Sequence, residues 1–279
     1  MTAAALLDLG ADVRWPDAEA AGAARTHTDR PAGRLGELVE WLSATQGKFR
    51  PELPRRARCI VLGSASDPLV ELAATLDIGV VSVELPVDAA AALSLGVQTA
   101  DDEIEAGADL LVLAGHDDAP APAAVVSVIA GAEPVALLPR GAAAVDTARW
   151  VDDATRMRSL RRRIVQLRAS PDELLAELGS PGLATAAGFA LRAAARRTPL
   201  VLDGTAAVAA GLLCADSQPR AREWWQVADT SPDRAHARAR EQLELRPLLD
   251  LGTDTGDGIA GALAVAVLHA AVVASGRDE

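Results

Sequence analysis

Tyrosine is absent from the 279-residue sequence, which also holds two phenylalanines, two cysteines and a single lysine, Lys48. The cysteines, Cys59 and Cys214, are far apart and both lie in apolar runs. This spacing excludes a disulfide scaffold and a cysteine metal motif, and it predicts two buried thiols in a reducing compartment. Because almost every cation is arginine, we interpret the arginine content as compositional bias and not as a sign of anion binding.

Positive charge is scarce as well, since the formal net charge is −12. A protein that binds the phosphates of nucleic acid needs a basic face, so this balance excludes nucleic acid as a partner. The one arginine-rich stretch, residues 156–168, has mixed spacing and predicts a solvated helix face.

The N-terminus lacks an uninterrupted hydrophobic run, because Asp8 and Asp12 divide a short apolar stretch that no basic region precedes. We therefore expect no signal peptide. The one stretch of membrane length, residues 258–275, is rich in Ala and Val and contains His269, which is typical of a buried core helix. We expect a cytoplasmic protein without a membrane partner, and we assign it no metal and no cofactor.

Half of the residues are apolar, which is enough to form a sizeable core. Short continuous apolar runs, as in strands buried on both faces, alternate with longer helical patterns. The predicted strands are 59–62, 80–83, 110–113, 125–129, 135–138 and 200–202. The predicted helices are 68–76, 89–106, 144–167, 171–178, 183–196, 204–214, 233–243 and 258–273. This alternation predicts an α/β fold with a parallel sheet and helices on both faces.

The N-terminal part has helical patterns but no predicted strand. Residues 17–45 form two helical pieces that are separated at Arg30-Pro31-Ala32-Gly33. One face of the second piece carries Leu35, Leu38, Val39 and Leu42. We therefore predict a helical lobe over residues 1–56 and an α/β core with a C-terminal helix over residues 57–279.

A glycine-rich turn, Gly256-Asp257-Gly258-Ile259-Ala260-Gly261, opens the last predicted helix. Its letters match the dinucleotide-binding fingerprint, but too few residues follow it to complete a βαβ unit, so we exclude that function. A helix N-terminus still offers free N–H groups and a positive dipole end to an anion. Asp257 is therefore either a partner of the helix dipole or a positioned base.

Two other polar segments follow predicted strands, where open α/β sheets bind their ligands. Asp203 precedes Gly204 after one strand and is either a helix N-cap or a site acid. His116 lies beside Asp117 and Asp118 in the Gly/Asp/Pro-rich stretch that follows another strand. These three side chains form either a solvated loop or an acid–base or metal cluster.

Other conspicuous side chains predict packing and not chemistry. His236 lies within a helical pattern near Arg234 and Arg238, so an exposed or packed imidazole is the default interpretation. The pair Trp224-Trp225 predicts packing at a domain edge or at an interface.

Several segments also carry a family pattern. In the C-terminal part these are residues 188–190 (GFA), 196–204 (RRTPLVLDG), 247–252 (PLLDLG) and 256–258 (GDG). Nearer the N-terminus they are residues 29–36 (DRPAGRLG) and 100–111 (ADDEIEAGADLL). Together these segments resemble the nicotinate-nucleotide–dimethylbenzimidazole phosphoribosyltransferases, enzymes that make the lower-ligand nucleotide of cobalamin.

The resemblance implies a Rossmann-like α/β core with a small helical lobe, a homodimer, and a reaction that needs no cofactor. The family moves phosphoribose from nicotinate mononucleotide to a benzimidazole nitrogen. A carboxylate takes the ring N–H proton, and glycine loops and helix ends hold the phosphate. Asp257 corresponds to the family's general-base Glu. The implied substrate-binding residues are Asp203, Gly204, His116, Arg140, Gly141, Gly256 and Gly258.

The chain departs from the family pattern at several of these loops. Asp257 is one methylene shorter than the Glu, and a misplacement of about 1 Å can cost ~10²-fold in rate. The glycine-rich phosphate loop corresponds to residues 115–120, which carry two carboxylates and Pro120, a residue without an N–H donor. Only Arg140-Gly141 remains of a second glycine loop, and a long family segment is missing between Asp67 and Ala90.

Two functions follow from this mixture of kept and altered segments. One is a phosphoribosyltransferase, with the family's substrate or a changed one, that uses Asp257 as its base. The other is a non-catalytic paralog that acts as a ligand-binding or partner subunit. The first requires affinity for phosphate beside Asp257, and the second requires a retained dimer face without that affinity. In either case we expect a small-molecule nucleotide or a benzimidazole as ligand.

Overall fold

The computed structural model describes residues 5–115, 120–138, 146–253 and 256–276. Its strands form one sheet in the order β2-β1-β3-β4-β5. The strands are β1 (Ala57–Leu62), β2 (Gly79–Val83), β3 (Leu110–Gly115), β4 (Leu200–Asp203) and β5 (Trp225–Val227). The α-helices are α1 (Leu6–Ala11), α2 (Ala18–Thr26), α3 (Gly33–Gln46), α4 (Asp67–Thr75), α5 (Ala89–Glu105), α6 (Ala121–Ile129), α7 (Thr147–Ile164), α8 (Pro171–Leu178), α9 (Pro181–Ala195), α10 (Gly204–Ser217), α11 (Arg234–Leu243) and α12 (Ile259–Ala274). Short 3₁₀ turns are η1 (Pro134–Leu137), η3 (Val165–Leu167) and η4 (Pro219–Trp224).

The sheet is parallel along each pair of neighbouring strands. Its register places Cys59 on β1 beside Val80 on β2 and Val112 on β3. Successive side chains point to opposite faces, so Cys59 and Ile60 belong to two different buried clusters. Both faces of the central strands are therefore apolar, which explains why these strands are continuous hydrophobic runs.

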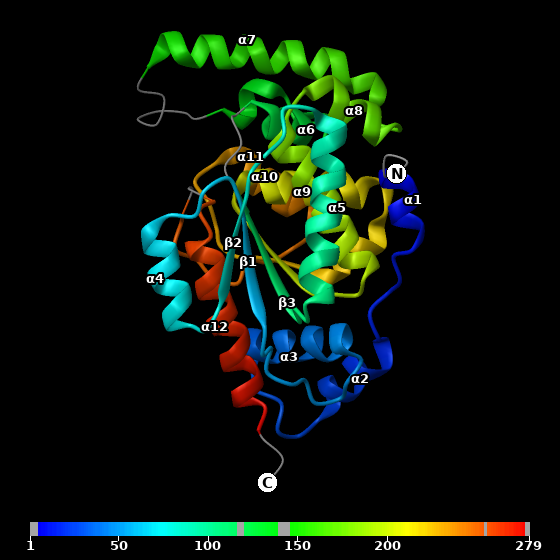
Figure 1. The fold of residues 1–279 in the computed structure, drawn as a ribbon, viewed down its shortest axis with the longest axis vertical. Coiled ribbons are helices and arrows are strands. Elements are labelled where there is room, and N and C mark those ends of the chain that lie inside the picture. Colours follow the sequence, from blue (N-terminus) through cyan, green and yellow to red (C-terminus); the bar gives the residue numbers. More distant parts are fainter. Residues whose placement is uncertain (1–4, 116–119, 139–145, 254–255, 277–279) are drawn as a thin grey trace.

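Helices cover both faces, as Figure 1 shows, with α5, α9 and α10 on one side and α4 and α12 on the other. Helix α3 packs against α12. This arrangement confirms the predicted α/β class with helices on both faces. Helix α12 buries Ala264, Val265 and Leu268 against the sheet and its neighbours, as expected for a core helix. Within the described ranges no helix is both long and apolar enough to cross a membrane.

The predicted break between the two N-terminal helical pieces is confirmed between α2 and α3. The apolar face of α3 packs into the core, where Leu38, Val39 and Leu42 are buried. A Cβ on Gly36 would lie 2.2 Å from the carbonyl oxygen of Pro31, so only glycine allows the preceding turn to fold back onto α3. Gly36, the last residue of the family-like segment 29–36, is therefore required by local packing.

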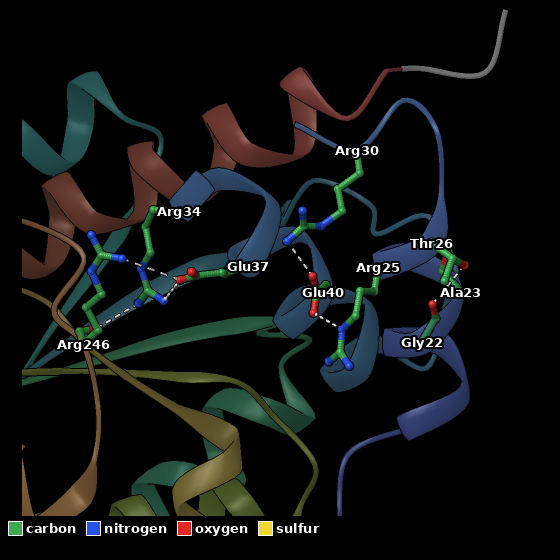
Figure 2. Close-up of polar contacts among 9 residues, drawn as sticks. All are labelled: Gly22, Ala23, Arg25, Thr26, Arg30, Arg34, Glu37, Glu40 and Arg246. Atoms are coloured by element: carbon green, nitrogen blue, oxygen red, sulfur yellow. Dashed lines mark hydrogen bonds and ion pairs between the residues drawn. The ribbon is translucent and has the colours of Figure 1, made fainter. Parts of the chain in front are cut away.

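Ion pairs hold the N-terminal helices together (Figure 2), and a hydrogen bond from Arg34 ties α3 to the sheet. Glu40 forms ion pairs with Arg25 on α2, at 2.8 Å, and with Arg30 in the connecting segment, at 2.6 Å. Arg34 pairs with Glu37 and also donates to the side chain of Gln226 on β5 and to the carbonyl of Arg246, each at 2.8 Å. One guanidinium therefore links the start of α3 to the edge of the sheet.

Two expectations about secondary structure are wrong, and one strand was missed. Residues 125–129 form the end of α6, which is buried along its whole length, and a short apolar run does not distinguish a buried helix from a strand. Residues 135–138 belong to a 3₁₀ turn and its end, which Pro134 begins. Strand β5 was not predicted, because it has only three residues.

The tryptophan pair, expected to pack at a domain edge or an interface, lies where the N-terminal segment meets the edge of the sheet. Trp225 opens the edge strand β5, and both indoles are almost fully buried. The indole N–H of Trp224 donates to the carbonyl of Arg14 at 2.7 Å, so this side chain anchors the N-terminal segment.

Candidate functional site

The carboxyl ends of β3 and β4 and the N-terminus of α12 meet at one end of the sheet. Strand β3 ends at Gly115, and β4 ends at Asp203, which leads directly into α10. Gly258 is the N-cap of α12. Ligands of open α/β sheets bind beyond the carboxyl ends of strands, so this convergence is the candidate site.

Glycine backbones fill the centre of this convergence. A Cβ on Gly204 would lie 2.5 Å from the Cα of Gly256, and a Cβ on Gly256 would lie 3.2 Å from the carbonyl oxygen of Gly115. Gly204 and Gly256 also have positive φ angles, +85° and +57°, which side chains disfavour. Loops from three parts of the sequence can thus touch here only because no side chain separates them.

Asp203 is 3% exposed and occupies the N-cap position of α10, but its side chain makes no capping bond to that helix. Its Oδ2 instead accepts the N–H of Gly261 in the first turn of α12, at 2.9 Å. Burial raises the pKa of this carboxyl to about 6, and the charges of Asp257 and Asp229 act in the same direction. The position of the predicted N-cap is confirmed, but the carboxylate caps a different helix.

Asp257 lies half-buried between two glycines, and its Oδ1 accepts the N–H of Ile259 at 3.1 Å. A Cβ on Gly258 would lie 2.9 Å from Leu69 and 3.1 Å from the sulfur of Cys59, so the backbone beside Asp257 packs directly on the core. The expected interaction of Asp257 with the start of the last helix is confirmed. Its role as a base stays a prediction.

Asp229, which the sequence reasoning missed, lies two residues beyond β5 and is 4% exposed. It accepts N–H bonds from Leu251 and Thr253 and the hydroxyl hydrogen of Thr253. Burial alone would disfavour its charge, but these donors outweigh burial and hold its pKa below the usual value. Asp203 was identified as a polar residue at the carboxyl end of a strand. Asp229 would have been identified in the same way if β5, which ends two residues before it, had been recognised.

The segment after Asp229 links α11 to α10. Asp233 caps α11 through the N–H of Ala235, at 2.8 Å, and also accepts the hydroxyl of Thr205 at 2.6 Å. His236 is 2% exposed, and its Nδ1 has no partner among the residues that the structure describes. Of the two interpretations of His236, the packed one is confirmed.

A family model described as phosphoribosyltransferase matches residues 86–276. The nicotinate-nucleotide–dimethylbenzimidazole phosphoribosyltransferase of Mycobacterium tuberculosis is 33% identical over 328 aligned residues, covering 95% of this chain and 91% of that protein. The chain belongs to the nicotinate-nucleotide–dimethylbenzimidazole phosphoribosyltransferase family.

Further members of this family agree in sequence and in fold. The protein of the same name from Mycobacterium ulcerans is 32% identical over 328 residues, with 95% of this chain and 91% of that protein covered. The crystal structure of the phosphoribosyltransferase of that name from Thermus thermophilus has 26% identity and a TM-score of 0.76. It covers 93% of this chain and 96% of the Thermus chain.

The alignment with the mycobacterial family member also shows what this chain lacks. It extends over 328 positions, whereas this chain has 279 residues, so the relative carries segments without a counterpart here. This agrees with the expectation of a missing family segment, although the alignment length does not locate it. The scaffold of the family is therefore retained in a shortened chain.

Part of the predicted phosphoribosyltransferase site lies outside the described residues. These are His116, Arg140 and Gly141, together with Asp117 and Asp118. Of the expected substrate-binding residues, the structure therefore brings together Asp203, Gly204, Gly256 and Gly258, with Asp257 between the last two.

The two thiols are buried, as expected, and burial is the main cause of their raised pKa. Burial raises the pKa of Cys59 to about 12, with a smaller effect from the charges of Asp203 and Asp257, and it also raises the pKa of Cys214. Both thiols therefore stay protonated at neutral pH. Among the described residues, no group of three or more His, Cys, Asp or Glu side chains is arranged to hold a metal ion.

His236 makes the stability of this region depend on pH. Burial lowers its pKa from 6.5 to about 4, so the folded state resists a proton that the unfolded chain accepts. The corresponding stability is complete above pH 6.5 and is lost as the pH falls towards 4.

Between pH 7.5 and pH 5 the free energy of unfolding should fall by about 2 kcal/mol because of His236. We expect His236→Gln to abolish this part of the pH dependence. The measurement is urea unfolding of both proteins at the two pH values. Any constant cost of the substitution cancels, because only the change with pH is compared. If both proteins lost the same stability on acidification, a buried neutral imidazole would be contradicted.

Proposed function

We propose that this chain transfers phosphoribose from nicotinate mononucleotide to a benzimidazole nitrogen. The observation that carries the proposal is the place of Asp257, a carboxylate fixed at the start of α12 beyond the carboxyl end of the sheet. Asp257 also stands where the family pattern has its general base. In this reaction Asp257 takes the proton of the ring N–H, the nitrogen bonds to the anomeric carbon, and nicotinate leaves with the electrons of the broken bond.

The glycine turns fit the role of binding a phosphorylated substrate. Gly204 and Gly256 pack on each other, which brings the N-termini of α10 and α12 to one end of the sheet, where first-turn N–H groups can bind a phosphate. Arg140, Gly141 and His116 are assigned to the same substrate on the family pattern alone. Asp203 is too deeply buried to be a strong candidate for direct contact, and we assign it to holding the first turn of α12.

The proposal also covers the assembly of the chain and its place in the cell. A homodimer in the cytoplasm, acting on a small-molecule nucleotide and a benzimidazole, fits the family to which the chain belongs. No nucleic acid is expected, in view of the net charge of −12.

One observation favours the alternative of a non-catalytic paralog that binds a ligand or a partner subunit. The mycobacterial relative carries segments that this chain lacks. If the missing segments include a wall of the substrate pocket, the scaffold would persist without turnover. Fold kinship alone does not decide between the two, because function depends on the site.

Isothermal titration tests the ligand affinity that the proposed transfer requires. The purified chain is titrated with nicotinate mononucleotide and, separately, with dimethylbenzimidazole. We expect the mononucleotide to bind, with affinity weakened by Asp257→Ala and unchanged by Asp250→Ala, which removes an exposed carboxylate of a nearby turn. If neither ligand binds at millimolar concentration, the proposed transfer by this chain is refuted and the paralog becomes the better account.

A further inference from the structure

The chain crosses from β5 to the loop after β4 shortly before it reaches Asp257. Beyond β5, Leu248 donates its N–H to Val227, and Leu249 donates to Ala228, each at 2.9 Å, so this segment runs alongside the sheet edge. By Gly256 the chain has returned to the loop after β4, where it packs on Gly204. Residues 250–253, here called the return turn, lie between these two points of the chain and so limit where the Gly256–Gly258 segment can meet the site.

One carboxylate sits inside the return turn. Asp229 Oδ1 accepts the N–H of Leu251 at 2.7 Å, and Oδ2 accepts the N–H and the hydroxyl of Thr253 at 2.9 and 2.8 Å. No cation forms an ion pair with Asp229 in the described part of the chain. Asp229 also accepts the backbone N–H of its neighbour Thr230, so its remaining contacts, three hydrogen bonds, are directed at donors of one segment.

The ionised state of Asp229 suits this task. A carboxylate is acceptor-only, whereas an asparagine side chain offers one acceptor oxygen and a donor amide. Hydrogen bonds to a charged acceptor are also shorter and stronger than neutral ones. An asparagine at this position would therefore leave at least one of the turn's donors facing another N–H group.

We infer that Asp229 is a positioning residue for Asp257, because it fixes the return turn from which the Gly256-Asp257-Gly258 segment extends. The inference rests on the proposed function, in which Asp257 is the base. Thr253 and Gly256 are three positions apart in the chain, so their Cα atoms lie within about 11 Å of each other and the place of the turn limits where Gly256 and Asp257 can lie. A displacement of about 1 Å at a reacting group can cost ~10²-fold in rate.

The same turn provides a matched control. The hydroxyl of Thr230 donates to Oδ1 of Asp250 at 2.8 Å, but this contact is exposed to solvent. Exposed polar pairs contribute little to stability. Asp250→Asn therefore changes a carboxylate of the return turn without removing the buried contacts of Asp229.

The experiment compares Asp229→Asn, Thr253→Val and Asp250→Asn in the full chain by steady-state kinetics. We expect Asp229→Asn to lower kcat about 10–100-fold and to raise KM for nicotinate mononucleotide by a smaller factor, since the reacting base must be placed more accurately than the glycine backbone that helps to hold the donor. Thr253→Val should lower kcat about 3–10-fold, because it removes only one of the donors. Asp250→Asn should leave both constants unchanged.

A double variant tests whether the effect passes through Asp257. In an Asp257→Asn background, Asp229→Asn should cause no further loss, since residues that act as a unit are not additive. Hydrogen exchange of the amides of Leu251 and Thr253 gives a readout that does not need activity, and it should accelerate in Asp229→Asn alone.

Each outcome is decisive. An Asp229→Asn protein with wild-type kcat or with wild-type exchange in the return turn would overturn the inference. The same holds for a loss of rate that persists in full without the Asp257 carboxylate, because it would indicate general damage. A wild-type chain with no turnover would refute the proposed function instead, and the exchange measurement would then decide whether Asp229 holds the turn.

Discussion

Replacing Asp257 with asparagine is expected to lower the rate of phosphoribosyl transfer by about 10²–10⁴-fold, the usual contribution of a general base. The amide keeps the size of the side chain and can still accept the N–H of Ile259, which Asp257 Oδ1 accepts at 3.1 Å. It cannot take a proton from the benzimidazole ring. Binding of nicotinate mononucleotide by the asparagine protein should therefore survive better than its turnover.

Asp257→Glu is the complementary variant. Glutamate adds the methylene by which this chain falls short of the family pattern, so we expect kcat to be maintained or raised. Rates are measured at saturating substrates by separating the phosphoribosylated benzimidazole from unreacted benzimidazole. If the asparagine variant turned over at the wild-type rate, Asp257 would not be the base, whatever the glutamate variant did.

Gly204→Ala is expected to destabilise the fold by about 3–5 kcal/mol, at the upper end for a single substitution. The added Cβ would lie 2.5 Å from the Cα of Gly256, and backbone on both sides leaves no flexible side chain to move away. The positive φ of +85° adds conformational strain. Urea unfolding followed by circular dichroism measures the loss.

Gly63→Ala is the matched control for Gly204→Ala. Gly63 also follows a strand and has a positive φ, +107°, but a Cβ there would meet no atom within 4 Å. Its cost should be only the conformational part, about 1–2 kcal/mol. Equal losses in the two variants would show that strain alone matters and that the loops after β3 and β4 do not depend on close contact with Gly256.

The parts of the fold that could be predicted from the sequence are those in which one physical cause dominates. The continuous apolar runs of β1, β3 and β4 are typical of strands buried on both faces, so together with the helices between them they predicted a parallel sheet. The run at 125–129 is just as apolar, but it follows Pro122 and packs on all sides as helix α6. Periodicity gives no signal when every position is buried.

The candidate site was predictable to a similar, limited extent. Asp203, Gly204 and the glycines around Asp257 could be found because they follow a strand or open a helix. The direction of the Asp203 side chain could not be predicted, since its donor, Gly261, lies 58 residues away in sequence. Asp229 was missed because the short strand before it carries no pattern of its own.

The electrostatics of the site likewise depend on distances that only the fold supplies. Burial is the main cause of the raised pKa of Asp203, and the nearby charges of Asp257 and Asp229 add to it. The three carboxylates come from separate segments of the chain. Their mutual influence therefore could not be derived from sequence spacing.

The most direct test of the account is a turnover assay of the purified wild-type chain with nicotinate mononucleotide and dimethylbenzimidazole, followed by mass spectrometry of the products. The account predicts equal amounts of free nicotinate and phosphoribosylated benzimidazole, formed at a rate that Asp257→Asn reduces at least about 10²-fold. Absence of both products at millimolar substrate would contradict it, and so would a product yield that does not depend on Asp257.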